Sequence, residues 1–524
     1  MAGYAAIVIG SGFGGAVAAC RLAEAGEKVL VLERGKRWRT EDFPRGPGDD
    51  WLFDVDEPEK QHGWIDLRLF RRMAVAQGAG VGGGSLIYAN IFVPAERFAF
   101  DAGWPAEVTF DAMAPHYRRA GDMLAVEEVP ANQLPPRAKL VREAAATIGD
   151  GARLRALPLA VRFDSAWHYG LDDPHGEQHA KFDTNRFGRR QGTCIHCGCC
   201  DLGCPVAARN SLDLNYLAMA EDKGAEIRPL SLVRAIEPVI GGGYRVTILR
   251  LDTGVTMTET AEKVIVAAGS LGSTELLLRC RDEHRTLPLL SPRLGHGWCA
   301  NGDFLTPALY PGRDVSPTRG PTITTAIDYL DGSDRGHRYF VEDGGFPDVL
   351  GNALQAALGR NFTGRRVLDG WRVMLSGLLR GRDPASFIMP WFGQGVDQPG
   401  GVMRLKRGLF GGGLELDLDY DVAGSEGVVQ AMVDRHEQLS RATGGIAAVP
   451  PTWSLFRYLV TPHPLGGCNM GTSRDDGVVD HRGEVFGYPG LFVMDGAVVP
   501  RALGLNPSRT IAALAERCMQ LMLA

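Results

Sequence analysis

The chain has 524 residues, which exceeds the size of one ordinary hydrophobic core and predicts two or more domains. Its net charge of −6 gives no sign of nucleic-acid binding, and no apolar run is long enough for a transmembrane segment. The first predicted strand begins by residue 4, which leaves no room for a signal peptide and favours a cytoplasmic location.

A dinucleotide-binding fingerprint occupies the N-terminus. Tyr4–Ile9 is an apolar run typical of a parallel strand buried on both faces, and a helical pattern follows a Gly-x-Gly-x-x-Gly spacing. The glycines permit a tight turn, a close approach of backbone to a pyrophosphate, and close packing of the helix. A second apolar run, Lys28–Leu32, ends in an acid that can accept hydrogen bonds from ribose hydroxyls. The candidate nucleotide contacts are Gly10, Gly12, Phe13, Gly14, Gly15 and Glu33.

A denser glycine run, Gly78–Gly84, has the same spacing but a different context. Arg71 and Arg72 closely precede it, and no convincing helix follows it, so it does not predict a second nucleotide-binding unit. Such a run favours backbone that lies flat against an extended ligand, with a flexible surface loop as the alternative. Its candidate cofactor contacts are Gly80, Gly83, Gly84, Ser85 and, further along, Asn90.

Four cysteines in the middle of the chain have the spacing of a bacterial ferredoxin, C-x2-C-x2-C-x3-C-P. They are Cys194, Cys197, Cys200 and Cys204, with Cys199 as an extra member. Three interpretations stay open: an iron–sulfur cluster, a zinc site, or thiols and disulfides that only brace a loop. Ten cysteines without an export signal favour thiols or metal ligands over a disulfide framework.

The C-terminal part of the chain returns to the nucleotide-binding region. Lys263–Ala268 is a third apolar strand, and Gly490–Met494 is a fourth that ends in Asp-Gly. Apolar residues then recur at helical spacing over Ser508–Leu523. Pro507 suits the first turn of this helix, and Asn506 could serve as its N-cap. The strands of the nucleotide-binding domain therefore come from three separated stretches of sequence.

These segments, in this order, resemble the glucose–methanol–choline (GMC) flavin oxidoreductases, and most closely their cholesterol oxidase branch. The resemblance also includes the segment His463–Cys468 and covers essentially the whole chain. It implies an α/β protein with a doubly wound, Rossmann-like FAD-binding domain and a substrate domain built on an antiparallel sheet. The expected limits are 1–100, 205–305 and 460–524 for the FAD-binding domain, and 101–204 and 306–459 for the substrate domain.

The resemblance also implies roles for individual residues. His463 and Asn506 match the two active-site positions of the family, and Val233 lies in the stretch whose valine backbone meets adenine. Asp495 and Gly496 match the part of the site near the ribityl chain and pyrophosphate of FAD, and Pro507 is a further candidate cofactor contact. Glu342 matches a glutamate of the sterol oxidases, although this alignment requires an insertion after Pro347.

Oxidising an alcohol removes a hydride from carbon and a proton from oxygen. FAD takes the hydride, so the protein supplies positioning and proton handling. A histidine titrates near neutrality, and an asparagine amide can stabilise a developing alkoxide. We therefore expect FAD-dependent oxidation of a sterol or another bulky apolar alcohol to a carbonyl, with O2 or another electron acceptor.

Two other functions remain open at this stage. One is a dehydrogenase that passes electrons to a quinone or a protein through the cysteine cluster. The other is an FAD-binding electron-transfer protein without alcohol turnover. The apolar stretch Trp371–Phe392 could line a substrate pocket, support a peripheral membrane contact, or belong to the ordinary core.

Overall fold

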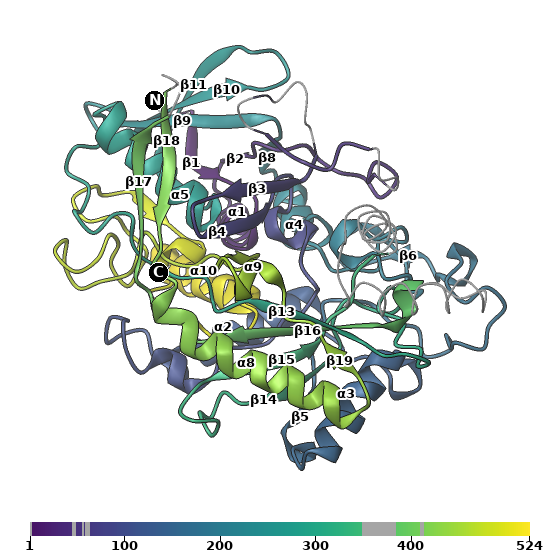
Figure 1. Ribbon diagram of the computed structural model, residues 1–524. Coiled ribbons are helices and arrows are strands. Elements are labelled where there is room, and N and C mark those ends of the chain that lie inside the picture. The colour runs from purple at the N-terminus through teal and green to yellow at the C-terminus, as the bar shows by residue number, and fades with distance from the viewer. Residues whose placement is uncertain (1–2, 45–48, 55–56, 58–62, 348–383, 409–412) are drawn as a thin grey trace.

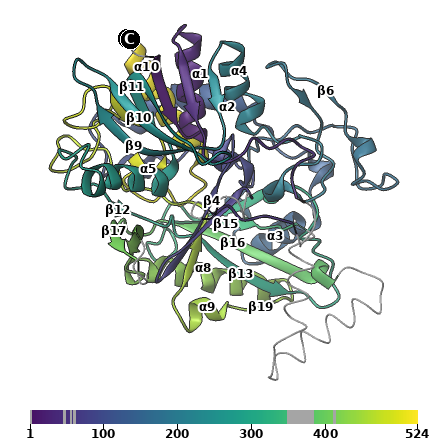
Figure 2. The same cartoon turned by 90° about the horizontal axis from the view of Figure 1, so that it is seen from above.

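The computed structural model describes residues 3–44, 49–54, 57, 63–347, 384–408 and 413–524 (Figure 1). Two large β-sheets organise these residues, and each carries helices of its own. In Figure 2 the strands β9, β10 and β11 lie with α1 and α10 in the upper part of the molecule. The strands β13, β15 and β16 lie with α8 in the lower part.

The first sheet has seven strands in the order β8-β2-β1-β11-β10-β9, with β21 also paired to β11. Its parallel strands are β1 (Tyr4–Ile9), β2 (Val29–Leu32), β8 (Glu226–Arg228), β11 (Thr256–Val266) and β21 (Leu491–Val493). The antiparallel strands are β9 (Ser231–Pro238) and β10 (Tyr244–Arg250). The strands come from three separated stretches, as predicted, because β11 pairs with both the N-terminal β1 and the C-terminal β21.

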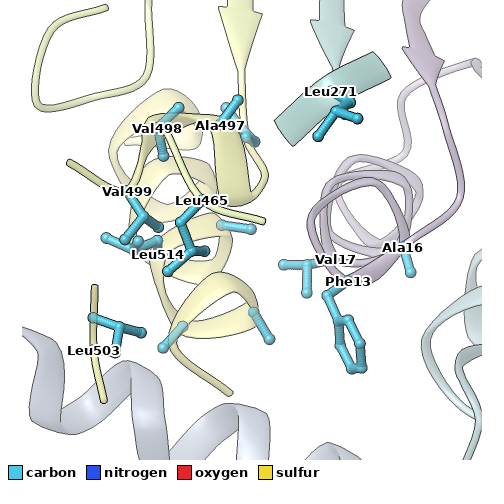
Figure 3. Close-up of a cluster of buried hydrophobic side chains, with 14 of the residues drawn as sticks. Phe13, Ala16, Val17, Leu271, Leu465, Ala497, Val498, Val499, Leu503 and Leu514 are labelled. Carbon is cyan, nitrogen blue, oxygen red and sulfur yellow. The ribbon is translucent and has the colours of Figure 1, made fainter. Parts of the chain in front are cut away.

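Helices cover this sheet and bury its apolar strands. They are α1 (Phe13–Glu24), α4 (Tyr216–Asp222), α5 (Gly269–Leu278) and α10 (Ser508–Leu523), and α1 contacts both α4 and α10. Val17 of α1 and Leu514 of α10 are both buried, and Figure 3 shows them in one apolar cluster. The helix α2 (Phe110–Leu124) packs against α10 from the other side.

The second sheet is antiparallel throughout, in the order β19-β13-β16-β15-β14-β5. Its strands are β5 (Leu154–Ala156), β13 (Phe304–Leu309), β14 (Thr325–Asp328), β15 (Tyr339–Asp343), β16 (Ile388–Gly395) and β19 (Ile446–Ala447). The helices α3 (Pro136–Thr147) and α8 (Ala423–Ala442) pack against it. The predicted fold class, a doubly wound nucleotide-binding sheet with a second antiparallel sheet, is confirmed.

Smaller sheets connect these layers. One has the order β20-β4-β3, formed by β3 (Ile65–Leu69), β4 (Met73–Gly78) and β20 (Leu459–Thr461). Another joins β12 (His296–Trp298), β17 (Gly401–Arg407) and β18 (Leu414–Asp419). A short pair is formed by β6 (Asp183–Thr184) and β7 (Arg190–Gln191), and the one-turn helix α9 (Pro451–Ser454) precedes β20.

Some local predictions need correction. The last helix begins at Ser508, so Pro507 occupies the N-cap position instead of the first turn, and no side chain caps the helix. Asn506 is therefore not its N-cap. Within the apolar stretch Trp371–Phe392, residues 371–383 lie outside the described residues, and the stretch from Ile388 onward is part of β16. No helix in the described part of the chain is both long and apolar enough to cross a membrane.

Candidate active site

The N-terminal glycines let three backbone segments meet at the start of α1. A Cβ atom on Gly14 would fall 1.5 Å from the carbonyl oxygen of Met494, and one on Gly15 would fall 2.1 Å from that of Gly10. Gly10 itself has φ +97° and faces the carbonyl of Ala267. The fingerprint thus allows α1 to pack directly on the ends of β11 and β21. The N-terminus of α1, with its free N–H groups, is therefore placed to bind a phosphate group.

The second glycine run lies against this turn. A Cβ atom on Gly83 would fall 2.6 Å from the Cα of Gly12. Ser11 joins the two loops, because its hydroxyl oxygen accepts the Gly82 N–H at 3.1 Å and lies 3.2 Å from the Gly80 carbonyl oxygen. The glycine run Gly78–Gly84, which we expect to lie flat against a ligand, is therefore largely buried beside the nucleotide turn. It is not an exposed loop.

The side chain of Glu33 hydrogen-bonds to the same region. Its carboxylate accepts the Ser11 N–H at 3.1 Å, the Ser11 hydroxyl at 2.6 Å and the Gly35 N–H at 2.9 Å. Burial raises the pKa of Glu33, and these hydrogen bonds oppose the shift. The backbone of Glu33 also accepts the N–H of Ser231 at 2.8 Å, which brings the start of β9, two residues before Val233, next to it.

Asn90 shows that this region can hold a polar ligand. Its side chain is fully buried, its backbone has φ +66°, and neither amide atom has a hydrogen-bond partner among the described residues. Its neighbours Tyr88 and Phe92 both contact Phe13, at centroid distances of 5.6 and 6.1 Å. An unpaired buried amide costs about 1–3 kcal/mol, and a bound cofactor with polar groups would satisfy it. The glycine cradle and Asn90 together fit FAD.

Asp495 joins the ends of two strands at the same edge of the sheet. Its carboxylate accepts the N–H groups of Ala497 and Gly269, both at 2.8 Å, and the hydroxyl of Ser273 at 2.5 Å. Gly496 then accepts the N–H of Gly466 at 2.9 Å through its carbonyl. The segment His463–Cys468 therefore runs along residues 496–498, and Figure 3 shows Leu465 close to Val499 and Leu514.

His463 is paired with a buried carboxylate. Its Nδ1 lies 2.9 Å from Oδ1 of Asp303, which is 2% exposed. Thr461 donates to the same carboxylate at 2.5 Å and accepts the backbone N–H of His463 at 2.9 Å. Burial raises the pKa of Asp303, and the neighbouring His463 opposes the shift. When the Nδ1–H group of His463 donates to Asp303, the Nε2 atom of the neutral ring has a lone pair that can accept a proton.

Asn506 lies in a loop that another asparagine holds in place. The Asn301 amide donates to the carbonyl of Leu505 at 2.9 Å and accepts the N–H groups of Leu503 at 2.9 Å and Gly504 at 3.0 Å. Asn506 is 5% exposed, and its Oδ1 has no partner among the described residues. The short stretch Asn301–Asp303 thus orders both the loop of Asn506 and the ring of His463.

Glu342 is the last residue but one of β15 and has no exposed surface. One carboxylate oxygen accepts a long hydrogen bond of 3.4 Å from Gln394, and the other has no partner among the described residues. Burial raises the pKa of Glu342 well above its usual value, and the nearby carboxyls of Asp343 and Asp303 add to the shift. Glu342 is thus close enough to Asp303, the partner of His463, for the two carboxyl groups to interact electrostatically.

The cysteine cluster forms a loop without disulfide bonds. None of the ten cysteines is part of a disulfide, so disulfide bracing is not present in the structure. Among the described residues, no three His, Cys, Asp or Glu side chains converge as ligands of a single metal ion. This arrangement argues against the zinc interpretation.

Sequence reasoning missed several residues that shape the site, namely Ser11, Asn301 and Asp303. Asn301 and Asp303 do carry a local signal, because they are polar residues directly before an apolar strand. Nothing local indicates that their partners lie 160 or more positions away.

Comparison with known proteins places the chain in a family. Two family models, both described as GMC oxidoreductase, match residues 4–284 and 431–515. The chain is 32% identical to a cholesterol oxidase of Acinetobacter baumannii, over 98% of this chain and 94% of the relative. It is 32% identical to a cholesterol oxidase of Mycobacterium tuberculosis, over 99% and 91%. The solved pyridoxine 4-oxidase from "Mesorbium loti" shares the fold, with a TM-score of 0.63 at 17% identity and 98% coverage of both chains. Given this extent of similarity, the chain belongs to the GMC oxidoreductase family.

Proposed function

We propose that the protein oxidises a sterol, or another bulky apolar alcohol, to the corresponding carbonyl compound, and that O2 takes up the electrons as hydrogen peroxide. The observation that carries the proposal is the His463–Asp303 pair, held by the same short stretch that orders the loop of Asn506. The full-length similarity to two cholesterol oxidases supports the substrate class.

The residues around the N-terminus of α1 would hold FAD. When bound, FAD accepts the hydride of the alcohol carbon. Backbone of the two glycine loops and the N-terminus of α1 would face the pyrophosphate, and the unpaired amide of Asn90 would hydrogen-bond the cofactor. The residues proposed for cofactor binding are Gly10, Gly12, Phe13, Gly14, Gly15, Glu33, Gly80, Gly83, Gly84, Ser85, Asn90, Val233, Asp495, Gly496 and Pro507.

His463 would accept the hydroxyl proton of the substrate at Nε2. Asp303 holds the opposite nitrogen, fixes the ring orientation and stabilises the charge that the ring gains. Asn506 would donate a hydrogen bond to the oxygen that becomes negative during the reaction. The oxidation therefore needs one base and one neutral donor, and both come from loops held by the stretch Asn301–Asp303.

Glu342 would act in a second step when the substrate is a sterol. A buried carboxyl group with a raised pKa can accept a proton and return it, which double-bond isomerisation after oxidation requires. Its unpaired oxygen leaves one acceptor available for this transfer. Oxidation and isomerisation would thus use different side chains.

A peripheral membrane contact is supported by an exposed apolar face on the sheet β20-β4-β3. Leu69 is 71% exposed and Val460 is 54% exposed, and both pair with Ala74, so they lie in line across this sheet. The exposed Arg71 and Arg72 lie in the turn between β3 and β4 and complement an anionic lipid surface.

The proposed limits of the FAD-binding domain remain 1–100, 205–305 and 460–524, and those of the substrate domain remain 101–204 and 306–459. The division of the strands between two large sheets supports these limits.

The test begins with the purified holoenzyme. FAD should be released by acid and identified by its mass, and anaerobic addition of a 3-hydroxysterol should bleach the flavin absorbance. Reoxidation by air should yield peroxide equal to the alcohol consumed. Recovery of NAD, or a flavin that no alcohol reduces, would refute the proposal. Reduction without peroxide would favour a dehydrogenase.

A further inference from the structure

The four spaced cysteines enclose a small cavity. Its walls include these four, Cys194, Cys197, Cys200 and Cys204, together with Cys199 and the apolar side chains of Val206 and Ala208. The volume open to the centre of a water molecule is about 10 Å³. We propose that this cavity binds a [4Fe–4S] cluster through these four cysteines. The iron and sulfide content of the protein is independent of alcohol turnover, so this proposal does not rest on the proposed function.

The way the thiols are arranged distinguishes a cluster from a single ion. A zinc ion needs all its ligands within about 2.3 Å of one point, and the described residues offer no such group. In a four-iron cluster each cysteine binds a different iron, so the sulfur atoms surround a volume instead of converging. Metal–sulfur bonds are also shorter than van der Waals contacts of about 3.5–4 Å. Each cysteine sulfur can therefore lie closer to its iron than to any unbonded neighbour.

The backbone around the cavity is shaped as a sulfur-binding loop. His196 and Ala207 have φ values of +54° and +52°, and Gly198 and Gly203 have +76° and +94°. Non-glycine residues in this conformation are strained, and turns of this kind direct successive N–H groups toward an anion. Two of these groups reach sulfur: His196 donates to Cys194 at 3.4 Å, and Ala208 donates to Cys204 at 3.2 Å.

Surrounding side chains hold this conformation without a ligand. The ring of His196 stacks on Trp167 at 3.9 Å, and its Nε2 lies 3.0 Å from the amide oxygen of Gln133. A Cβ atom on Gly198 would fall 2.1 Å from the carbonyl oxygen of Thr318. A loop so closely fitted is preorganised for a ligand of fixed shape.

A buried cation also lines the cavity. Arg209 is 4% exposed and donates to the Cys200 carbonyl at 2.5 Å, and its Nε has no partner in the described part of the chain. When the cluster binds, four thiols lose their protons to solvent and four iron–sulfur bonds form. A [4Fe–4S]²⁺ core with four thiolates then carries two negative charges. The guanidinium of Arg209 would offset part of the cost of burying them.

Arg209 also connects the cavity to the cofactor loop. The same Nη1 lies 3.1 Å from the carbonyl oxygen of Leu86 and 3.3 Å from that of Ser85. Ser85 lies two residues after Gly83, which lies against the nucleotide turn at Gly12. One side chain therefore bridges the cysteine loop and the loop proposed to touch FAD, which places the cluster site beside the cofactor site.

The decisive experiment measures metal and cofactor together. Protein expressed with iron and purified without oxygen should contain about four irons and four acid-labile sulfides per FAD. Reduction with dithionite should give the electron paramagnetic resonance signal of a reduced cluster. The double variant Cys197→Ser/Cys200→Ser should lose at least tenfold in iron and sulfide while it retains FAD. The matched control Cys280→Ser removes a buried thiol outside the loop and should keep the iron.

Three results would overturn the proposal. They are full FAD occupancy without iron or sulfide after anaerobic reconstitution, zinc in place of iron with no sulfide, and iron content unchanged in the double variant. If the double variant fails to fold, Cys204→Ala and Cys194→Ala provide the same comparison, and flavin content reports whether the chain is folded.

Discussion

At the scale of single residues, the base of the proposed reaction depends on a carboxylate far away in sequence. Replacing Asp303 by asparagine keeps the shape of the side chain but can present an N–H group to Nδ1 of His463. The ring would then favour the tautomer with the proton on Nε2, where the substrate proton must go. We expect Asp303→Asn to slow anaerobic flavin reduction by ~10²–10⁴-fold with FAD still bound. Stopped-flow absorbance measures this, and the exposed Asp434→Asn should leave the rate unchanged.

His463 and Asn506 themselves should have separable effects. His463→Gln should lower the rate of flavin reduction by ~10²–10⁴-fold, because a positioned base is lost. Asn506→Leu should lower it by ~10²–10³-fold, because one donor to a developing charge is lost. Wild-type rates of flavin reduction in both variants would remove these residues from the site while leaving the family membership intact.

Glu342 should matter to a different product. We expect Glu342→Gln to spare the oxidation of a sterol and to abolish the isomerisation that follows, as resolved by chromatography of the two ketones. In the wild type the isomerisation should accelerate as pH rises through the raised pKa of this carboxyl group, because only the carboxylate accepts a proton. Equal loss of both steps in the variant would contradict a separate role.

At the scale of secondary structure elements, the contact between α1 and β21 offers a sharp test. A methyl group on Gly14 would overlap the carbonyl oxygen of Met494, so Gly14→Ala must push the helix away from the strand end. We expect a stability loss of ~1–3 kcal/mol in urea unfolding and a lower FAD content. Gly400→Ala is the matched control, since a Cβ atom there meets nothing within 4 Å. A Gly14→Ala variant with normal FAD content would show that this packing does not shape the site.

The same elements show how far the sequence alone could lead. The strands β1 and β2 and the helix α1 are predicted correctly because a local pattern, apolar run followed by glycine turn, determines them. Asp303 and Asn301 escape prediction because their roles exist only through contacts with residues 463 and 503–505. Arg209 escapes for the same reason: its value lies in bridging two loops that are separated by more than 100 positions.

At the scale of the whole molecule, buried acids should make stability depend on pH. Asp397 accepts hydrogen bonds from the Ala300 N–H at 2.9 Å and the Tyr420 hydroxyl at 2.5 Å, and burial raises its pKa to about 7. Between its unfolded pKa of about 4 and this folded value, the carboxyl is protonated only in the folded state. Unfolding therefore releases a proton, and the stabilisation present at low pH is lost as pH rises toward 7.

The variant Asp397→Asn should lack this contribution. The wild type should lose up to ~1.4 kcal/mol per pH unit more than the variant between pH 5 and 7, with parallel curves above that range. Urea unfolding at each pH measures both proteins. A wild-type curve parallel to that of the variant over this range would mean that Asp397 is ionised in the folded protein.

The pairing of β21 with β11 has a consequence for biosynthesis. β21 begins only at residue 491, and the carbonyl of Met494 just after it forms part of the wall around the first helix. A nascent chain on the ribosome can thus display its glycine fingerprint after its first few dozen residues, yet the cradle stays open until Met494 has been translated. We therefore expect FAD to bind only after β21 has been synthesised. Any premature stop codon before β21 yields a chain that lacks this wall, however complete its remaining domains.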